Sequence, residues 1–589
     1  MPPLTRRFLL LASAAGLAIP AIAQVQEAAP PAPATTQPAP ATPAPAPTPS
    51  PSPAPAVSRP STAVVDDVVE QDVTLEPPPP PVEYPDFAQR NPFVTGALDP
   101  ASAGLGTDPW GQARGAFLET LMRRMKTPVA SRWAHIGLRN AMLASARAPR
   151  GINPVDWAAE RAWLLLRLGE ADAAELVIAS VDTDKFTPKM AQVAVQSALA
   201  NSDPLALCPV SDSVQKAEPR VTALVQAICA GLNGEPERAK ALIESARRRG
   251  TVGGIDLALA QKVVGATADT GTAATIEWEP VQALTAWRYG LATATAMSPP
   301  ERLMTDAPTQ VRAWYATAPM IPLRDRLESA RIATGLGVLS SQALTDFYAW
   351  IYDATDPNEL SGSDGWQLRL AYAATDQASR LSAMRRLWKL GESRVLKESS
   401  RALLARASAR IAPSTELQDE APELIASMLA AGMDREAARW KDAVAGMDDE
   451  QADQSWAMLA LGAPEGSVDV SAARVNDFIG RDDSPRKKRS ALLVAGLAAL
   501  GRLDAGAASR LNGRYGLDIQ RASGWTQMID GAARRNQPGS VLVLAASGLQ
   551  AADFDAVPSS HIFHIVMALR NSGQEFLARM VAAEALSRT

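Results

Sequence analysis

Residues 164–181 read LLLRLGEADAAELVIASV, and this stretch contains the pattern that decides the fold. An apolar run ends at Gly169, and a second periodic run follows it. The positions five, eight, nine and twelve residues after the glycine are Ala174, Val177, Ile178 and Val181. These spacings place the four side chains on one face of an α-helix. The stretch therefore predicts two helices joined by a tight turn.

The same pattern returns at residues 227–246, 424–444 and 565–585. The turn glycines there are Gly234, Gly432 and Gly573. After Gly432 one apolar position is Lys441, and after Gly501 the pattern fails. Glycine lets a helix end in a left-handed residue, and a small residue five positions later allows the next helix to approach closely. Each such hairpin leaves apolar surface that a neighbouring hairpin covers.

We therefore expect an all-α fold, an α-solenoid or superhelix of stacked helical hairpins that follows a disordered N-terminal arm. The Gly/Thr-rich residues 250–275 suggest a break, so the body divides into a first sub-array at 89–265 and a second at 266–589. Signals for strands are scarce, and VLVLAAS at 541–547 is the main ambiguous run.

The hairpins resemble tetratricopeptide-like repeats, in which a turn glycine is followed five residues later by alanine. The half-repeat that matches best contains Gly234, Ala239, Ile243 and Ala246. The small residue that the family places seven positions before the glycine is present at Ala162 and Ala227 and missing at Ile425 and Val566. The family's terminal proline is also missing. The resemblance implies helix-hairpin stacking rather than membership of the strict family.

The first residues have the layout of a secretory signal peptide, which we place at residues 1–23. Arg6 and Arg7 precede a short apolar run, and Ala21 to Ala23 supply the small residues that a signal peptidase accepts. The arginine pair fits a twin-arginine export signal as well as an ordinary basic region, so the route stays open. The apolar run is too short to span a bilayer, so we expect no transmembrane segment in the mature chain and a location in the bacterial periplasm.

Residues 24–88 predict a disordered, Pro/Ala-rich tether. Residues 24–86 contain 19 of the chain's 46 prolines and little that could be buried. These residues include eight acidic side chains and only one basic side chain, Arg59, whereas the body from Phe87 onward is close to neutral. A neutral body argues against nucleic acid as a partner. The acidic and valine-rich residues 63–76 fit either a spacer or a segment that docks on a partner.

Two basic clusters stand out, at 247–249 and 486–489. They fit solvated helix ends or contacts to an anionic cell-wall polymer. The acidic loop 353–365 fits a capping loop better than a calcium site, because its spacing is not that of an EF-hand. Tryptophans inside helical patterns predict core wedges between hairpins; they include Trp163, Trp287, Trp388 and Trp440.

Cysteine and histidine are rare. Cys208 and Cys229 are the only cysteines, and an even count in an exported protein favours one disulfide between them. The three histidines are His135, His561 and His564. The last two share one face of an expected helix, but a zinc site needs at least a third ligand and none is marked nearby. We expect no metal site and no cofactor.

The helical body also resembles the superhelix of soluble lytic transglycosylases, whose catalytic domain carries a Glu-Ser pair and a Gly-Leu-Met-Gln stretch. Glu-Ser pairs occur at Glu392–Ser393 and Glu398–Ser399, but Gly-Leu-Met-Gln is missing and the C-terminus continues the hairpin pattern. The resemblance therefore stops at the superhelix and assigns no catalytic residue.

These observations favour an exported, non-catalytic scaffold or adaptor that binds envelope proteins or peptides. Stacked hairpins present long surfaces suited to such partners. Two alternatives remain: a cell-wall or polysaccharide-acting enzyme with a superhelical body, and an accessory subunit of an export or assembly machine.

Overall fold

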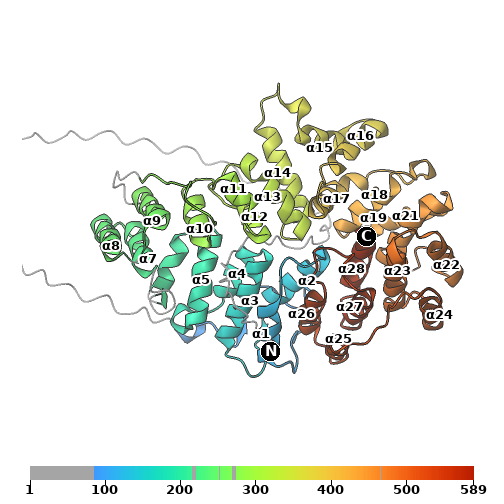
Figure 1. The fold of residues 1–589 in the computed structure, drawn as a ribbon, viewed down its shortest axis with the longest axis horizontal. Coiled ribbons are helices and arrows are strands. Elements are labelled where there is room, and N and C mark those ends of the chain that lie inside the picture. Colours follow the sequence, from blue (N-terminus) through green and yellow to red (C-terminus); the bar gives the residue numbers. More distant parts are fainter. Residues whose placement is uncertain (1–84, 212, 215–220, 251, 268–273, 465) are drawn as a thin grey trace, which may run out of the picture. The chain divides into compact units, whose positions relative to one another are not determined.

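The computed structural model describes residues 85–589 except 212, 215–220, 251, 268–273 and 465 (Figure 1). The expected signal peptide and nearly all of the expected arm lie outside these described residues. Residues Arg90–Thr589 form one compact unit. The described chain is all-α, as the hairpin pattern predicts. Its one sheet pairs β1 (Val94–Thr95) antiparallel with β2 (Ala146–Arg147).

The described helices up to residue 315 are α1 (Gly115–Arg124), α2 (Arg132–Leu143), α3 (Pro154–Leu168), α4 (Ala171–Ile178), α5 (Pro188–Ala200), α7 (Thr222–Leu232), α8 (Pro236–Arg249), α9 (Gly254–Thr267), α10 (Ala286–Ala294), α11 (Glu301–Thr305) and α12 (Thr309–Tyr315). Short 3-10 turns in the same part are η1 (Asp86–Ala88), η2 (Thr183–Lys185) and η3 (Leu205–Val210).

The next helices are α13 (Leu323–Leu336), α14 (Ser341–Asp353), α15 (Asp364–Ala373), α16 (Gln377–Trp388), α17 (Arg394–Ser408), α18 (Ala421–Ala430), α19 (Asp434–Ala438), α20 (Lys441–Ala445) and α21 (Asp449–Gly462). The last are α22 (Ala472–Arg481), α23 (Lys488–Ala499), α24 (Ala505–Tyr515), α25 (Gly524–Arg534), α26 (Pro538–Gly548), α27 (Ser559–Asn571) and α28 (Glu575–Ser587). The 3-10 turns here are η4 (Leu360–Gly362), η5 (Thr415–Leu417) and η6 (Pro485–Lys487).

The four predicted turn glycines and Gly501 all have a positive φ. The values are 128° at Gly169, 78° at Gly234, 75° at Gly432, 71° at Gly501 and 83° at Gly573. In each turn the amide of the residue after the glycine donates to the carbonyl five residues earlier, at 2.8 to 2.9 Å. This bond closes a Schellman cap, which satisfies a carbonyl that the helix end leaves unpaired. The turn at Gly501 is therefore a hairpin turn although its apolar pattern fails.

Three further turns have the same hydrogen bond without a glycine. Ser202, Ala296 and Asn536 have φ values of 54°, 57° and 50°. The amides of Asp203, Met297 and Gln537 then donate to carbonyls five residues earlier, at 2.9, 2.9 and 3.1 Å. A search for turn glycines misses these hairpins, because the residue with a positive φ in each turn is not a glycine. Residues other than glycine rarely adopt this conformation, so the sequence gives no signal for it.

Small residues let the helices of a hairpin approach closely. The alanines five positions after the turn glycines are fully buried; they are Ala174, Ala239, Ala437 and Ala578. The ambiguous run at 541–547 lies in α26 and is buried except at Ser547. A run that is apolar all round fits a buried helix as well as a strand, and here it forms the helix.

Many helices pack on their neighbours in the chain, and others pack on helices that are distant in sequence, such as α5 on α10 and α21 on α28. Helix α9 packs on both α7 and α10. The boundary expected at 265/266 falls inside α9, and it stays a prediction. Helix α2 packs against α26 and α28, and Figure 1 shows the blue α2 beside these red helices.

Candidate functional site

A cluster of buried charges joins α2 to α28. Glu584 on α28 accepts hydrogen bonds from Ser131 Oγ at 2.5 Å and from the Arg132 amide at 2.8 Å. It also lies 3.3 Å from the amide of Trp133. These amides belong to the first turn of α2, where donors lack helical partners and the helix dipole favours an anion. Glu584 thus caps a helix whose first residue is 452 positions away in sequence.

Arg132, the first residue of α2, caps two other helices. Its Nε donates to the Thr334 carbonyl at 2.9 Å and its Nη1 donates to the Ala430 carbonyl at 2.6 Å. These carbonyls lie in the last turns of α13 and α18, where a cation complements the helix dipole. Burial lowers the pKa of Arg132, while Glu398 and Glu584 oppose that shift.

Two more arginines complete this group, which we call the closure cluster: Ser131, Arg132, Glu398, Arg401, Glu423, Glu584 and Arg588. Arg401 makes two bonds of 2.9 Å to the Glu423 carboxylate and one of 3.2 Å to the Ser587 carbonyl. Arg588 donates to Glu584 at 2.5 Å and to the Ala130 carbonyl at 2.8 Å. The cluster therefore connects α2, α13, α17, α18 and α28.

Glu398 on α17 belongs to one of the two Glu-Ser pairs that were compared with the catalytic pair of lytic transglycosylases. Burial and then the nearby Glu584 raise the pKa of Glu398, which lies 3.8 Å from Arg401. Glu398 and Ser399 are 3% and 1% exposed, so a polysaccharide cannot reach them. In the other pair, Ser393 caps α17 by accepting from the Leu396 amide at 3.2 Å. We therefore interpret the closure cluster as structural.

The histidines have separate partners. On α27, His561 Nδ1 donates to the Gly548 carbonyl at 3.0 Å, and His564 Nδ1 donates to Asp530 at 2.9 Å. His135 Nε2 lies 2.8 Å from Glu170 in a fully buried pair. Within residues 85–589 as described, no three His, Cys, Asp or Glu side chains are grouped so that they could hold a metal ion.

A disulfide in the structure joins Cys208 to Cys229, with the Cα atoms 5.4 Å apart. Cys208 lies in η3 and Cys229 in α7. The bond therefore ties η3 to α7. These two residues are the pair that the sequence predicts.

The basic clusters differ in their surroundings. At the end of α8, Arg247 pairs with Glu244 at 2.7 Å and the side chains are exposed. In the second cluster, Lys487 Nζ donates to the Ile479 carbonyl at 2.7 Å, and Lys488 Nζ donates to the Val557 carbonyl. These lysines therefore cap other segments, which leaves the exposed Arg486 and Arg489 for any contact with an anionic polymer.

The acidic loop and the tryptophans have local structural roles. Asp356 accepts from the Asn358 amide at 2.8 Å, and Ser363 caps α15 by accepting from the Trp366 amide at 3.1 Å. Trp287 and Trp440 are buried, while Trp163 and Trp388 are half-buried against the core. The indole nitrogens of Trp287 and Trp388 donate to the Asp256 carbonyl and to Ser427 Oγ.

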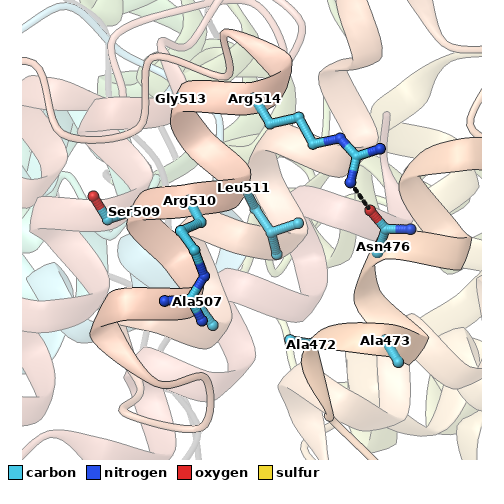
Figure 2. A pocket seen from close by; sticks show the side chains of 9 residues that line it. All are labelled: Ala472, Ala473, Asn476, Ala507, Ser509, Arg510, Leu511, Gly513 and Arg514. Carbon is cyan, nitrogen blue, oxygen red and sulfur yellow. Dashed lines mark hydrogen bonds between the residues drawn. The ribbon is translucent and has the colours of Figure 1, made fainter.

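A groove of about 720 Å³ runs between α22 and α24. Nine residues line it: Ala472, Ala473, Asn476, Ala507, Ser509, Arg510, Leu511, Gly513 and Arg514. Figure 2 shows Arg514 reaching from α24 toward Asn476 on α22. Arg514 Nη1 donates to Asn476 Oδ1 at 3.3 Å, and the Tyr515 hydroxyl donates to the same oxygen at 2.9 Å.

The groove combines small side chains with two arginines. Its only ionisable side chains are Arg510 and Arg514, and arginine stays protonated in proteins. The lining thus offers no side chain that could act as a general base near neutral pH. Its small residues permit close approach of a backbone, and its guanidinium groups suit carboxylates. The apolar offsets after Gly501 do not reveal the groove, because they report only on the packing of a hairpin. The signal that could have shown it is the run AGAAS at 505–509, which leaves α24 with little side-chain volume.

None of the helices in the described ranges has the length and the apolar character needed to cross a membrane. Comparison with protein-family models, with curated proteins and with solved structures finds no match. The resemblance to tetratricopeptide-like repeats therefore stays a prediction from the residues.

Proposed function

We propose that this protein is an exported, non-catalytic scaffold or adaptor that binds a protein or peptide in the bacterial envelope. The observation that supports it is the groove between α22 and α24, which is lined by small side chains and two arginines. A helix or an extended segment of a partner can lie in such a groove, and its carboxylates can pair with the guanidinium groups.

Gly513 adds support because it is a glycine inside α24 that lines the groove. Apart from its chain neighbours and the backbone of its own helix, no atom lies within 4 Å of the place where its Cβ would stand. Glycine inside a helix costs roughly 1 kcal/mol relative to alanine. A partner that approaches the helix backbone closely would explain a glycine at this position.

The test is cross-linking in living cells, followed by affinity purification of the full-length protein and mass spectrometry. Gly513→Leu adds a side chain to the groove at a position with space for its Cβ, and it favours the helix. We expect it to fold at least as stably as the wild type and to lose the cross-linked partner.

Gly480→Leu is the matched control. Gly480 also lies on an exposed helix face with nothing within 4 Å of its Cβ position, but it does not line the groove. A partner retained by Gly480→Leu and lost by Gly513→Leu supports the proposal. Wall polysaccharide fragments recovered in place of a protein contradict it.

The proposed location has its own test. Fractionation of cells that express the full chain is expected to place the protein in the periplasm after removal of residues 1–23. Replacement of Arg6 and Arg7 by lysine blocks export if the route is the twin-arginine one and leaves it intact otherwise. A protein that stays in the cytoplasm with residues 1–23 intact contradicts the export proposal.

A further inference from the structure

Arg326, in the first turns of α13, lacks a carboxylate partner. Its Nη1 donates to the Ala316 carbonyl at 3.4 Å, and its buried Nε has no hydrogen-bond partner. The nearby Glu328 pairs instead with Arg331 at 3.3 Å and with Arg312 at 3.8 Å. Among the described residues, no carboxylate lies within 4.0 Å of the Arg326 guanidinium.

The electrostatic surroundings of Arg326 agree with this geometry. Burial lowers the pKa of Arg326, and the groups that oppose the shift are the hydroxyls of Tyr289 and Tyr315. The guanidinium remains charged, because arginine does not lose its proton in proteins. A half-buried charge without a counter-ion is unfavourable, and a carboxylate supplied from outside would relieve it.

Two aromatic side chains of α14 lie near this cation. The Arg326 guanidinium stands 5.6 Å from the ring centre of Phe347, and that ring is 6.2 Å from the ring of Trp350. Trp350 is 55% exposed, whereas Phe347 is buried. Arg324 donates to Thr355 Oγ1 at 3.0 Å, which holds the start of α13 against the end of α14. The guanidinium and the exposed indole are thus both neighbours of the Phe347 ring.

From this juxtaposition we propose that the α13–α14 surface binds an acidic segment of a partner protein. A carboxylate of the segment pairs with Arg326, and an apolar side chain beside it covers Trp350. Hot spots of protein interfaces are enriched in arginine and tryptophan, and a guanidinium forms strong, charge-assisted hydrogen bonds with a carboxylate. The inference rests on the proposed binding function and names the chemistry of the partner.

A protein segment fits this surface better than a polyanion does. A polyanion is attracted by an extended basic field, and the body from Phe87 onward is close to neutral. A single unpaired guanidinium beside an exposed indole matches one carboxylate next to one apolar side chain. Acidic peptide motifs present that combination.

The other side of α14 offers a matched control. Arg369 stands over the ring of Tyr352 at the same distance of 5.6 Å, and Tyr352 stacks on Trp366 at 6.5 Å. Arg369 is exposed, whereas Trp366 is half-buried. Arg369→Gln therefore removes an equivalent charge next to an aromatic ring outside the proposed surface.

The test presents a phage-displayed library of random linear peptides to the full-length protein. We expect the recovered peptides to share an aspartate or glutamate beside an apolar residue. Their affinity is expected to fall about 30-fold or more on Arg326→Gln and about 5-fold or more on Trp350→Ala. The affinity for Arg369→Gln is expected to stay unchanged.

Trp350→Ala keeps the test decisive if Arg326→Gln fails to fold, because the Trp350 side chain is mostly exposed. Peptides without an acidic residue, or equal binding to the wild type and to Trp350→Ala, overturn the inference. A partner that cross-links in cells and binds both variants normally overturns this surface while the proposed function stands.

Discussion

The closure cluster and helix α8 use the same charged residues in opposite ways. In the closure cluster, Arg132, Arg401 and Glu584 are almost entirely buried and hydrogen-bonded across helices. On α8, Arg238 pairs with Glu235 at 2.8 Å and Lys240 with Glu237 at 2.9 Å, and these side chains are exposed. The burial of a charge, more than its presence, decides what it contributes to the fold.

The physical reason lies in solvation. In an exposed ion pair, each charged group replaces contacts with water by contacts with its partner. Such a pair stabilises the folded protein by at most about 1 kcal/mol. A buried charge has lost its water, so removal of its partner leaves an uncompensated charge in the interior. The contacts between α2 and α28 should therefore be sensitive to single substitutions, whereas those of α8 should tolerate them.

The largest expected effect comes from Glu584→Ala. The change leaves the first amides of α2 without their acceptor and Arg588 without its carboxylate. We expect a loss of about 3 to 5 kcal/mol in the free energy of unfolding, measured by chemical denaturation. Glu235→Ala at the N-cap of α8 is the control, and a loss there of similar size would remove the distinction between the two regions.

The second largest loss of stability is expected from removal of the disulfide, which lies in the region of α7 and α8. Cys208 and Cys229 close a loop across a sequence separation of 21 residues. Replacement of both by alanine is expected to cost about 3 kcal/mol in the chain-entropy model. An unfolding midpoint that is the same for this variant as for the oxidised wild type would show that the bond adds no stability.

Asp172 on α4 has a partly buried carboxyl. Its burial is intermediate between that of the closure cluster and that of the exposed charges on α8. Burial, with contributions from Glu175 and Glu170, raises the pKa of Asp172 from 3.8 to about 7. The folded protein then keeps a proton that the unfolded chain loses, so this residue reduces stability as the pH rises from about 4 to 7.

Asp172→Asn is expected to remove that loss. We expect a gain of about 2 kcal/mol near pH 8, less than the full shift implies because part of the carboxyl meets solvent. The gain should disappear near pH 3, where the carboxyl is protonated in both states. Unfolding curves at the two pH values check this, and an equal gain at both would refute the assigned cause.

The smallest effect concerns a turn that has no glycine. Ala296 has a φ of 57°, which an alanine adopts at a cost of roughly 1 to 2 kcal/mol. Ala296→Gly is expected to stabilise the protein by about 0.5 kcal/mol after the added freedom of the unfolded chain is counted. Ala349→Gly, at an exposed position inside α14, should instead destabilise it by roughly 1 kcal/mol.

The hairpin architecture was predictable because it depends on local rules. Glycine at Gly234 and a small residue at Ala239 suffice to predict a turn and a close helix pair. Turns at Ser202 and Ala296 were not predictable in this way, since strain at those residues is offset by contacts elsewhere. The disulfide could be predicted from the cysteine count alone, because only one pairing of two cysteines exists.

The contacts between distant helices were not predictable from one sequence. Arg132 and Glu584 lie in helical patterns where a charge normally indicates a solvated face. Their burial depends on two helices that are 452 residues apart at this contact. The candidate surfaces could not be predicted either. In the sequence, Arg326 and Arg514 cannot be distinguished from ordinary exposed arginines, because their neighbours in space are not known.

The hydrogen bonds of the closure cluster should make α2 and α28 one cooperative unit, and amide hydrogen exchange tests this most directly. In Glu584→Ala we expect the amides of α2 and α28 to lose protection together, while those of α8 exchange as in the wild type. Loss of protection in α28 alone, with α2 unchanged, would contradict the account.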